Sequence, residues 1–221
     1  MGAEAKQPAT TDAARGRGCF IAFEGIEGCG KSTQIHRLAE RIRTAGRRVL
    51  LTREPGGTPV GEGIRRLLLE PEYGTLDGLT ELFLLLASRR SHLEERIRPA
   101  LERGEVVLCD RYADSSVAYQ GGGRRLGLER VEELNRLATG GLMPDLTILL
   151  DLSAVEGLRR ITARPGAEDR LESEARAFHE RVRGAYLEIA RRRGGRYRVL
   201  DGAGAVAGLA REIWEAVSRL L

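Results

Sequence analysis

The clearest chemical signal in this 221-residue sequence is one short glycine-rich segment, Gly25-Ile26-Glu27-Gly28-Cys29-Gly30-Lys31-Ser32. It matches the spacing G-x-x-x-x-G-K-[ST], whose glycines let backbone N–H groups turn inward toward phosphate oxygens. Lys31 is expected to reach the β- and γ-phosphates of ATP, and the Ser32 hydroxyl to help hold Mg²⁺. We take the candidate ATP-binding residues to be Gly25, Ile26, Glu27, Gly28, Cys29, Gly30, Lys31, Ser32 and Thr33.

The use of lysine supports this interpretation. The chain has 36 basic residues, of which only Lys6 and Lys31 are lysines. A sequence that uses arginine almost everywhere else keeps a compact ammonium on a flexible stem inside the loop. We therefore expect Lys31 to be a catalytic residue.

Alternating hydrophobic patterns place this loop between a strand and a helix. Short runs rich in Val, Ile and Leu predict five buried strands, at residues 19–24, 48–52, 105–110, 145–152 and 196–200. Periodic apolar positions predict helices at residues 31–45, 64–69, 79–103, 128–139, 154–163, 172–193 and 206–221, and Pro99 is a candidate kink in the third. Strand–helix alternation of this kind is typical of a parallel sheet covered on both sides.

The fold expected is therefore α/β: a P-loop NTPase-type three-layer sandwich with a five-stranded parallel sheet, helices on both faces and a short lid. One domain is expected over residues 18–221, with the lid at about 164–172. Residues 1–17 are polar and lack the apolar core of a secretory signal, so we expect a disordered tail there.

Composition restricts the classes of partner. The net charge is +4, which permits nucleic-acid binding, but carboxylates are interleaved with the basic residues and aromatics are few. We favour solvated helix faces and a small anionic substrate, with no nucleic acid and no membrane partner, since no apolar run of 18 residues occurs. Cys19, Cys29 and Cys109 are an odd number without metal-ligand spacing, which favours buried thiols in a reduced, cytoplasmic setting.

The loop alone does not identify the reaction. A GTP switch would need an N-K-x-D element, for which no lysine remains, and motor proteins are normally larger. Small nucleotide and metabolite kinases remain, and these need a second anion site and a lid that excludes water. Arg53, Arg89 and Arg111 each follow a separate element and are candidates for binding an acceptor phosphate.

Several further motifs occur in order, and with them the chain resembles the bacterial thymidylate kinase family from residue 19 to the end. They are Phe23-Glu24-Gly25, Thr52-Arg53-Glu54-Pro55-Gly56-Gly57-Thr58, Ala87-Ser88-Arg89, Asp110-Arg111-Tyr112, Asp114-Ser115-Ser116, Ala118-Tyr119-Gln120-Gly121 and Asp169-Arg170-Leu171-Glu172. The resemblance implies an enzyme that transfers the γ-phosphate of ATP to thymidine 5′-monophosphate (dTMP), giving dTDP for dTTP synthesis.

The resemblance also implies roles for individual residues. Glu27 would lie near the sugar 3′-hydroxyl and the metal, Arg53 and Arg111 around the acceptor phosphate, and Arg89 at the thymine edge. Ser115, Ser116, Tyr119 and Gln120 would face the base and deoxyribose, and Asp110 would be a carboxylate associated with Mg²⁺. Leu85 takes the place of a phenylalanine that stacks on thymine in many relatives, and Phe83 should point elsewhere on the helix.

Some members of the family carry a catalytic arginine inside the phosphate-binding loop, and this loop has none. Charge in the transition state must then be neutralised from elsewhere. The resemblance to the form with lid arginines implies that Arg164 and Arg170 are catalytic together with Lys31 and Glu27. A solvated charged loop is the alternative for each lid arginine.

Two rival functions stay open at this point: a kinase for another nucleoside monophosphate such as dUMP, and a nucleotide-binding regulator without phosphoryl transfer. The resemblance implies a homodimer, and the apolar helical segment 79–86 is a candidate interface, with core burial as its alternative.

Overall fold

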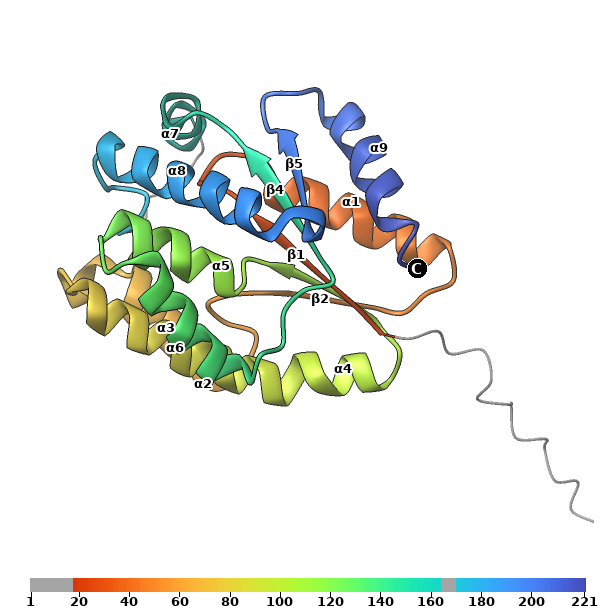
Figure 1. Cartoon of the computed structure of the whole chain (residues 1–221), viewed down its shortest axis with the longest axis horizontal. Coiled ribbons are helices and arrows are strands. Elements are labelled where there is room, and N and C mark those ends of the chain that lie inside the picture. The colour runs from red at the N-terminus through yellow and green to blue at the C-terminus, as the bar shows by residue number, and fades with distance from the viewer. Residues whose placement is uncertain (1–17, 164–169) are drawn as a thin grey trace, which may run out of the picture.

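All five expected strands occur and form one parallel sheet. The computed structural model describes residues 18–163 and 170–221 (Figure 1). The expected tail, residues 1–17, and the lid positions 164–169, with Arg164, lie outside the described residues. The strands are β1 (Cys19–Glu24), β2 (Val49–Arg53), β3 (Val106–Asp110), β4 (Leu146–Asp151) and β5 (Tyr197–Asp201), in the order β2-β3-β1-β4-β5.

Helices cover both faces of this sheet, which confirms the three-layer α/β architecture (Figure 1). The helices are α1 (Lys31–Thr44), α2 (Pro59–Leu69), α3 (Gly78–His92), α4 (Arg98–Glu102), α5 (Ala113–Ser116), α6 (Leu128–Thr139), α7 (Ala154–Thr162), α8 (Arg176–Arg193) and α9 (Val206–Val217). Among the described residues, short segments of 3₁₀ or π geometry are η2 (Pro71–Tyr73), η3 (Leu93–Ile97), η4 (Val117–Gly123) and η5 (Gly194–Arg196). Helices α1 and α9 pack on one side of the sheet, while α4 and α8 pack on the other.

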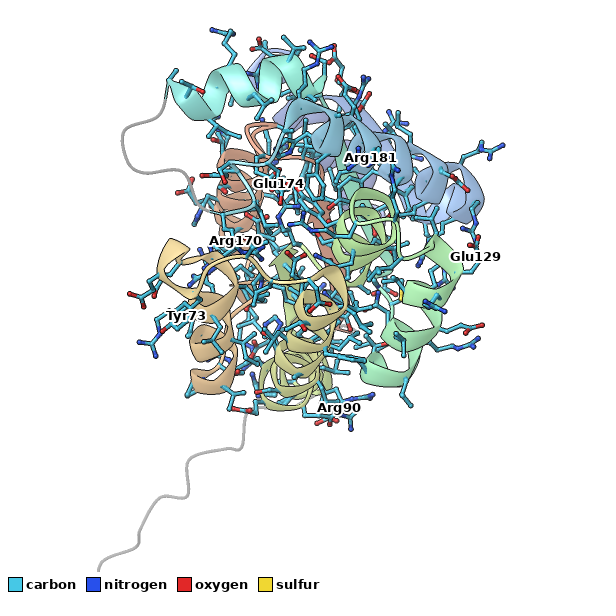
Figure 2. All side chains as sticks on the ribbon, turned by 90° about the vertical axis from the view of Figure 1, so that its left-hand side faces the viewer. Tyr73, Arg90, Glu129, Arg170, Glu174 and Arg181 are labelled. Carbon is cyan, nitrogen blue, oxygen red and sulfur yellow. The ribbon has the colours of Figure 1, made fainter. Side chains whose placement is uncertain are left out.

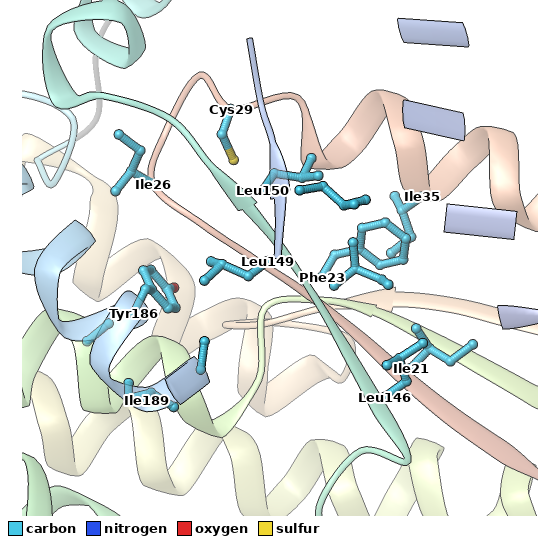
Figure 3. Packing of buried hydrophobic residues seen from close by; sticks show 14 of the residues in the cluster. Ile21, Phe23, Ile26, Cys29, Ile35, Leu146, Leu149, Leu150, Tyr186 and Ile189 are labelled. Carbon is cyan, nitrogen blue, oxygen red and sulfur yellow. The ribbon is translucent and has the colours of Figure 1, made fainter. Parts of the chain in front are cut away.

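Alternate residues of the central strand face opposite layers, as a strand buried on both sides requires. Ile21 and Phe23 belong to a cluster that includes Ile35 of α1, and Figure 3 shows these side chains together on one side of the sheet. Phe20 and Ala22 belong to a second cluster with residues of η3 and α4. Each face of β1 is therefore fixed by a different helical layer.

The expected helix at residues 79–103 is not continuous. It divides into α3, the π segment η3 and α4, and Pro99 lies in the first turn of α4. A proline has no N–H to donate, and its ring crowds the carbonyl four residues earlier. Widening the backbone to a π turn just before Pro99 relieves that contact.

Three other expectations about helices were wrong in extent. Helix α2 begins at Pro59 and not at residue 64, because Thr58 caps it and proline suits the first helical position. Helix α8 begins at Arg176 and not at residue 172, and α9 ends at Val217. Residues 113–123, for which the sequence indicated no element, form α5 and η4 despite three consecutive glycines.

This topology brings functional residues to one edge. The strands run parallel, so Glu24, Arg53 and Asp110 end β1, β2 and β3 at the same side of the sheet. Ligands of open α/β sheets bind outside that carboxyl edge. Of the helices in the described residues, none has the length and apolar character needed to cross a membrane.

Candidate active site

A cavity of about 530 Å³ lies at this edge and collects most of the predicted site residues. Its walls include Glu27, Gly28, Gly30, Lys31, Ser32, Thr33, Arg53, Leu85, Arg89, Asp110, Arg111, Ser115, Ser116, Tyr119 and Gln120. Gly25, Ile26 and Cys29 belong to the same loop but do not line the cavity, and Arg170 does not line it either. The residues predicted for the two substrates therefore share one cavity.

The loop from Gly25 to Ser32 has the backbone that its glycines predict. Gly25, Gly28 and Gly30 all have positive φ, with values of 138°, 73° and 95°. A Cβ at Gly28 would also stand 2.5 Å from the carbonyl oxygen of Gly157 in α7, and a Cβ at Gly157 would stand 2.7 Å from that of Glu27. The phosphate-binding loop and α7 thus touch backbone to backbone through a pair of glycines.

Lys31 begins α1 and reaches back over the loop. Its Nζ donates to the carbonyl oxygens of Gly25 at 3.0 Å and Ile26 at 2.9 Å, and the residue is only 8% exposed. The positive end of α1 and this ammonium are on the same side of the cavity. Together they make a site for phosphate oxygens.

Ser32 and Asp110 meet across the loop and β3. The Ser32 hydroxyl donates to Asp110 Oδ2 at 3.1 Å, and both residues line the cavity. Within residues 18–163 and 170–221, no cluster of three or more His, Cys, Asp or Glu side chains forms a metal cage. One hydroxyl and one carboxylate suit Mg²⁺, which keeps waters and takes further oxygens from a nucleotide.

Glu27 is held by partners from separate elements. Arg111 Nη2 donates to Glu27 Oε1 at 2.8 Å, and the Tyr119 hydroxyl donates to the same oxygen at 2.5 Å. Burial alone would raise the pKa of Glu27, but the charge of Arg111 and a hydrogen bond with His179 oppose it and lower that pKa to about 2. Glu27 is therefore a fixed anion at the cavity wall.

Arg111 adopts a backbone conformation that arginine rarely takes, with φ of 70°. Its Nη1 donates to the Gly25 carbonyl at 3.0 Å and to the Tyr186 hydroxyl at 3.1 Å. The side chain of Arg111 therefore connects the end of β3 to the phosphate-binding loop. Strain of this kind persists where surrounding contacts fix it, as at active sites.

His179, on α8, is a contact that the sequence did not indicate. Its Nδ1 lies 3.5 Å from Glu27 Oε2, and the residue is 1% exposed. Burial lowers the pKa of His179, but the hydrogen bond and charge of Glu27, and the backbone carbonyls of Glu174 and Glu172, raise it above the ordinary value. His179 thus places a ring nitrogen at ion-pair distance from the second oxygen of Glu27.

This pair should make stability depend on pH. A histidine whose pKa is higher in the folded state stabilises the protein fully below the unfolded pKa, and the gain is lost as pH rises through the folded pKa. We expect His179→Asn to lower the free energy of unfolding at pH 6 more than at pH 9, measured by urea titration. Replacement of the exposed His36 by Asn is the control. An equal loss at both pH values would contradict a charged His179.

Behind Glu27, the buried carboxyl of Glu24 organises a second group. Glu24 accepts from the Tyr112 N–H at 2.8 Å, the Ser115 hydroxyl at 2.6 Å and the Tyr186 hydroxyl at 2.8 Å. Burial, only partly offset by the hydrogen bond from Ser115, raises the pKa of Glu24 to about 7. This network fixes Ser115 beside Arg111.

Arg89 makes four hydrogen bonds within the protein. It donates from Nε to Glu54 at 2.8 Å, from Nη1 to Ser116 at 3.0 Å and Asn135 at 2.5 Å, and from Nη2 to the Tyr112 carbonyl at 3.1 Å. A guanidinium has five N–H groups, so these four bonds leave one that has no partner in the described part of the chain and is free for a ligand. Arg89 is 1% exposed and lines the cavity, so that N–H has a fixed direction.

Two predictions about side-chain direction on α3 agree with the structure. Leu85 lines the cavity, whereas Phe83 is 56% exposed and points elsewhere. At the neighbouring edge, Arg53 pairs with Glu62 of α2, with Nη2 2.9 Å from Oε2, and is half exposed. Arg53 is thus available at the mouth of the cavity.

Several residues of the site were not singled out by the sequence analysis. Glu54 holds Arg89 and also contacts His92, and it did occur within one of the motifs. Asn135 and Tyr186 lie on α6 and α8, where apolar periodicity predicts burial but not the cavity they approach. Arg160 of α7 also lines the cavity, donating to the carbonyls of Gly28 and Gly202.

Comparison with known proteins agrees with this geometry. The family described as thymidylate kinase matches residues 23–213. Curated thymidylate kinases include that of Syntrophotalea carbinolica, 48% identical over 91% of this chain and 96% of its own, and that of Pseudomonas putida, 52% identical over 89% and 93%. The crystal structure of thymidylate kinase from Ehrlichia chaffeensis superposes with a TM-score of 0.74 and 33% identity, covering 91% of this chain and 99% of that one. The chain therefore belongs to the thymidylate kinase family.

Proposed function

We propose that this protein transfers the γ-phosphoryl group of ATP to dTMP, producing dTDP for dTTP synthesis. The observation that carries the proposal is a single cavity with Lys31 and the loop glycines at one part of its wall and Arg89 and Leu85 at another. The first part suits a triphosphate and the second suits a pyrimidine base. Family membership agrees with this pairing of donor and acceptor.

The reaction proposed is a direct in-line transfer without a phosphoenzyme. The acceptor is a phosphate oxygen that is already anionic near neutral pH, so no strong general base is needed. Lys31 would neutralise charge on the transferring phosphoryl group, since its Nζ already lies over the loop carbonyls. Positioning and charge neutralisation would supply most of the catalysis.

On the acceptor side, Arg53 and Arg111 are proposed to hold the dTMP phosphate, and Glu27 to lie near the sugar hydroxyl. Arg89, Leu85, Ser116 and Gln120 are proposed to surround the base, and Ser115 and Tyr119 the deoxyribose. We propose that the ring of Tyr119, whose hydroxyl donates to Glu27, would exclude a ribose 2′-hydroxyl.

Magnesium is the metal that the family's use of ATP implies, and we propose Ser32 and Asp110 as the residues that would hold it. When bound, Mg²⁺ would neutralise charge on the phosphate oxygens. Arg164 is proposed as a lid arginine that neutralises transition-state charge, because residues 25–32 contain no arginine. Arg170 is treated separately below.

The proposal is tested by ADP release with purified protein, ATP, Mg²⁺ and a panel of nucleoside monophosphates. We expect dTMP to give the highest kcat/KM. A preference for dUMP or another acceptor would favour the rival kinase assignment. No ADP release with any acceptor would favour a nucleotide-binding regulator.

Leu85 gives a gain-of-function prediction. Leu85→Phe would place a ring against the base, and aromatic pairs contribute about 0.5–1.5 kcal/mol beyond their buried area. We therefore expect KM for dTMP to fall by about two- to tenfold, from initial-rate kinetics. Phe83→Leu, at an exposed position of the same helix, is the matched control. An unchanged or higher KM in Leu85→Phe would show that Leu85 does not face the base.

A homodimer is proposed as the assembly, with α3 at its interface. Of the expected apolar segment, Leu82 is buried in the core, whereas Leu79 and Phe83 are 41% and 56% exposed. Sedimentation equilibrium of wild type and Phe83→Glu tests this: a dimer that becomes a monomer supports it. The three buried cysteine thiols agree with a cytoplasmic location, which we also propose.

A further inference from the structure

Glu81 is a fully buried carboxylate in the first turn of α3, and it is not among the residues lining the cavity. It accepts from Arg124 Nη2 at 2.8 Å and Nε at 3.1 Å, from Arg170 Nη1 at 2.7 Å, and from Gln120 Nε2 at 3.1 Å. A buried carboxylate with two arginine partners costs desolvation free energy. Through its contact with Gln120, which lines the cavity, Glu81 can affect the site.

The charge of Glu81 determines which way the Gln120 amide is turned. Burial raises the pKa of Glu81, but hydrogen bonds from Arg124, Arg170 and Gln120 lower it below the ordinary value. An ionised carboxylate can only accept hydrogen bonds, so Gln120 must present its NH₂ to Glu81. The Gln120 carbonyl, Oε1, is then a buried acceptor without a partner among the described residues.

Arg170 reaches this cluster from the last residues of the expected lid, the part of it that the structure describes. Its Nε donates to the Leu68 carbonyl at 2.9 Å and its backbone N–H to the Leu69 carbonyl, so it is bound to the end of α2. Arg124 also pairs with Glu174, at 2.6 Å. Figure 2 shows Arg170 and Glu174 on one face of the molecule, between α2 and α8. These contacts hold Arg170 to α2 and α3.

We propose that Glu81, paired with Arg124 and Arg170, is a positioning residue that turns the Gln120 carbonyl toward the base of the acceptor. Arg170 is thereby assigned to positioning in place of the catalytic role that the resemblance implied. The inference rests on the proposed function, because it presumes that the base binds beside Gln120.

The consequence is selectivity among pyrimidines. A fixed carbonyl at the wall of the cavity accepts from the ring N3–H of thymine. Cytosine has an unprotonated N3 at that place, and two acceptors would then face each other. A site whose buried polar group is left unpaired rejects the wrong ligand strongly.

The test compares dTMP with dCMP in wild type, Glu81→Gln, Arg170→Gln and the double variant. A glutamine at 81 both donates and accepts, so it no longer dictates the orientation of Gln120. We expect the dTMP:dCMP ratio of kcat/KM to fall at least tenfold in Glu81→Gln, with KM for ATP unchanged. Glu132→Gln, which alters contacts to Arg192 and Arg193 on another face, is the control and should keep the wild-type ratio.

Arg170→Gln should lower the same ratio while kcat for dTMP stays within about threefold, and the double variant should be no less selective than the worse single variant. A large fall in kcat with an unchanged ratio would make Arg170 catalytic and overturn the inference. The wild-type ratio in Glu81→Gln would also overturn it.

Calorimetric Kd values for dTMP and dCMP give the ratio of affinities without turnover, so failure of phosphoryl transfer is distinguished from failure of positioning. Far-ultraviolet circular dichroism checks folding, and the double variant, in which one charge of each sign is removed, serves if Glu81→Gln is unstable.

Discussion

Replacing Lys31 by alanine is expected to lower kcat by about a hundredfold to a thousandfold or more, the loss seen when one preorganised transition-state contact is removed. Lys31 is the only lysine after the first six residues, and its Nζ lies over the phosphate-binding loop at 2.9–3.0 Å from two carbonyls. No other lysine can replace it. Turnover measured by coupled ADP release, with melting followed by circular dichroism, separates loss of chemistry from loss of fold.

Lys31→Arg is the informative companion. It keeps the positive charge but brings a planar guanidinium into a loop shaped by glycines, and arginine and lysine are not interchangeable at such a site. We expect it to be nearly as inactive as Lys31→Ala while melting near the wild-type temperature. Wild-type activity in Lys31→Ala would contradict the phosphate-binding role of the loop.

Replacing Arg89 by methionine is expected to lower the free energy of unfolding by about 3–5 kcal/mol, as for other broken buried ion pairs. The change leaves the carboxylate of Glu54, 3% exposed, with His92 as its remaining side-chain partner of the pair. Asn135 and Ser116 lose a donor as well. KM for dTMP should rise by about ten- to a hundredfold, since the charged hydrogen bond that we propose between Arg89 and the base would be lost.

A second substitution separates these two effects. In Arg89→Met with Glu54→Gln, the buried charge is removed along with its partner, so we expect urea titration to show most of the stability restored. The defect toward dTMP should persist, because the base would still lack its donor. Recovery of both stability and dTMP binding in the double variant would show that Arg89 does not contact the base.

The sequence predicted the part of the site that is local along the chain. The P-loop spacing places Lys31 and Ser32 directly after Gly30, at the start of α1, and strand ends place Arg53, Asp110 and Arg111 at one edge of a parallel sheet. Both inferences depend only on geometry within a few residues or within one sheet. Leu85 was implied by the family resemblance, and only the different direction of Phe83 followed from helical periodicity.

The missed residues depend on how distant helices pack. His179 and Tyr186 lie on the same buried face of α8 as Val182. The apolar pattern of that face predicts that these residues are buried, but not which element they contact. The position of Arg170 depends on the path of a loop, which spacing does not determine. Glu81 did carry a signal, since it is a carboxylate in the otherwise apolar stretch LTELFLLLA.

The glycine pair Gly28 and Gly157 has a consequence for how this enzyme can change over generations. Gly157 has no side chain, and any side chain there would collide with the backbone of the phosphate-binding loop and push α7 away from it. We expect as few residue types to be tolerated at position 157 as at position 28, although only Gly28 belongs to a recognisable motif. Substitutions at Gly157 would therefore abolish activity without replacing any side chain of the proposed site.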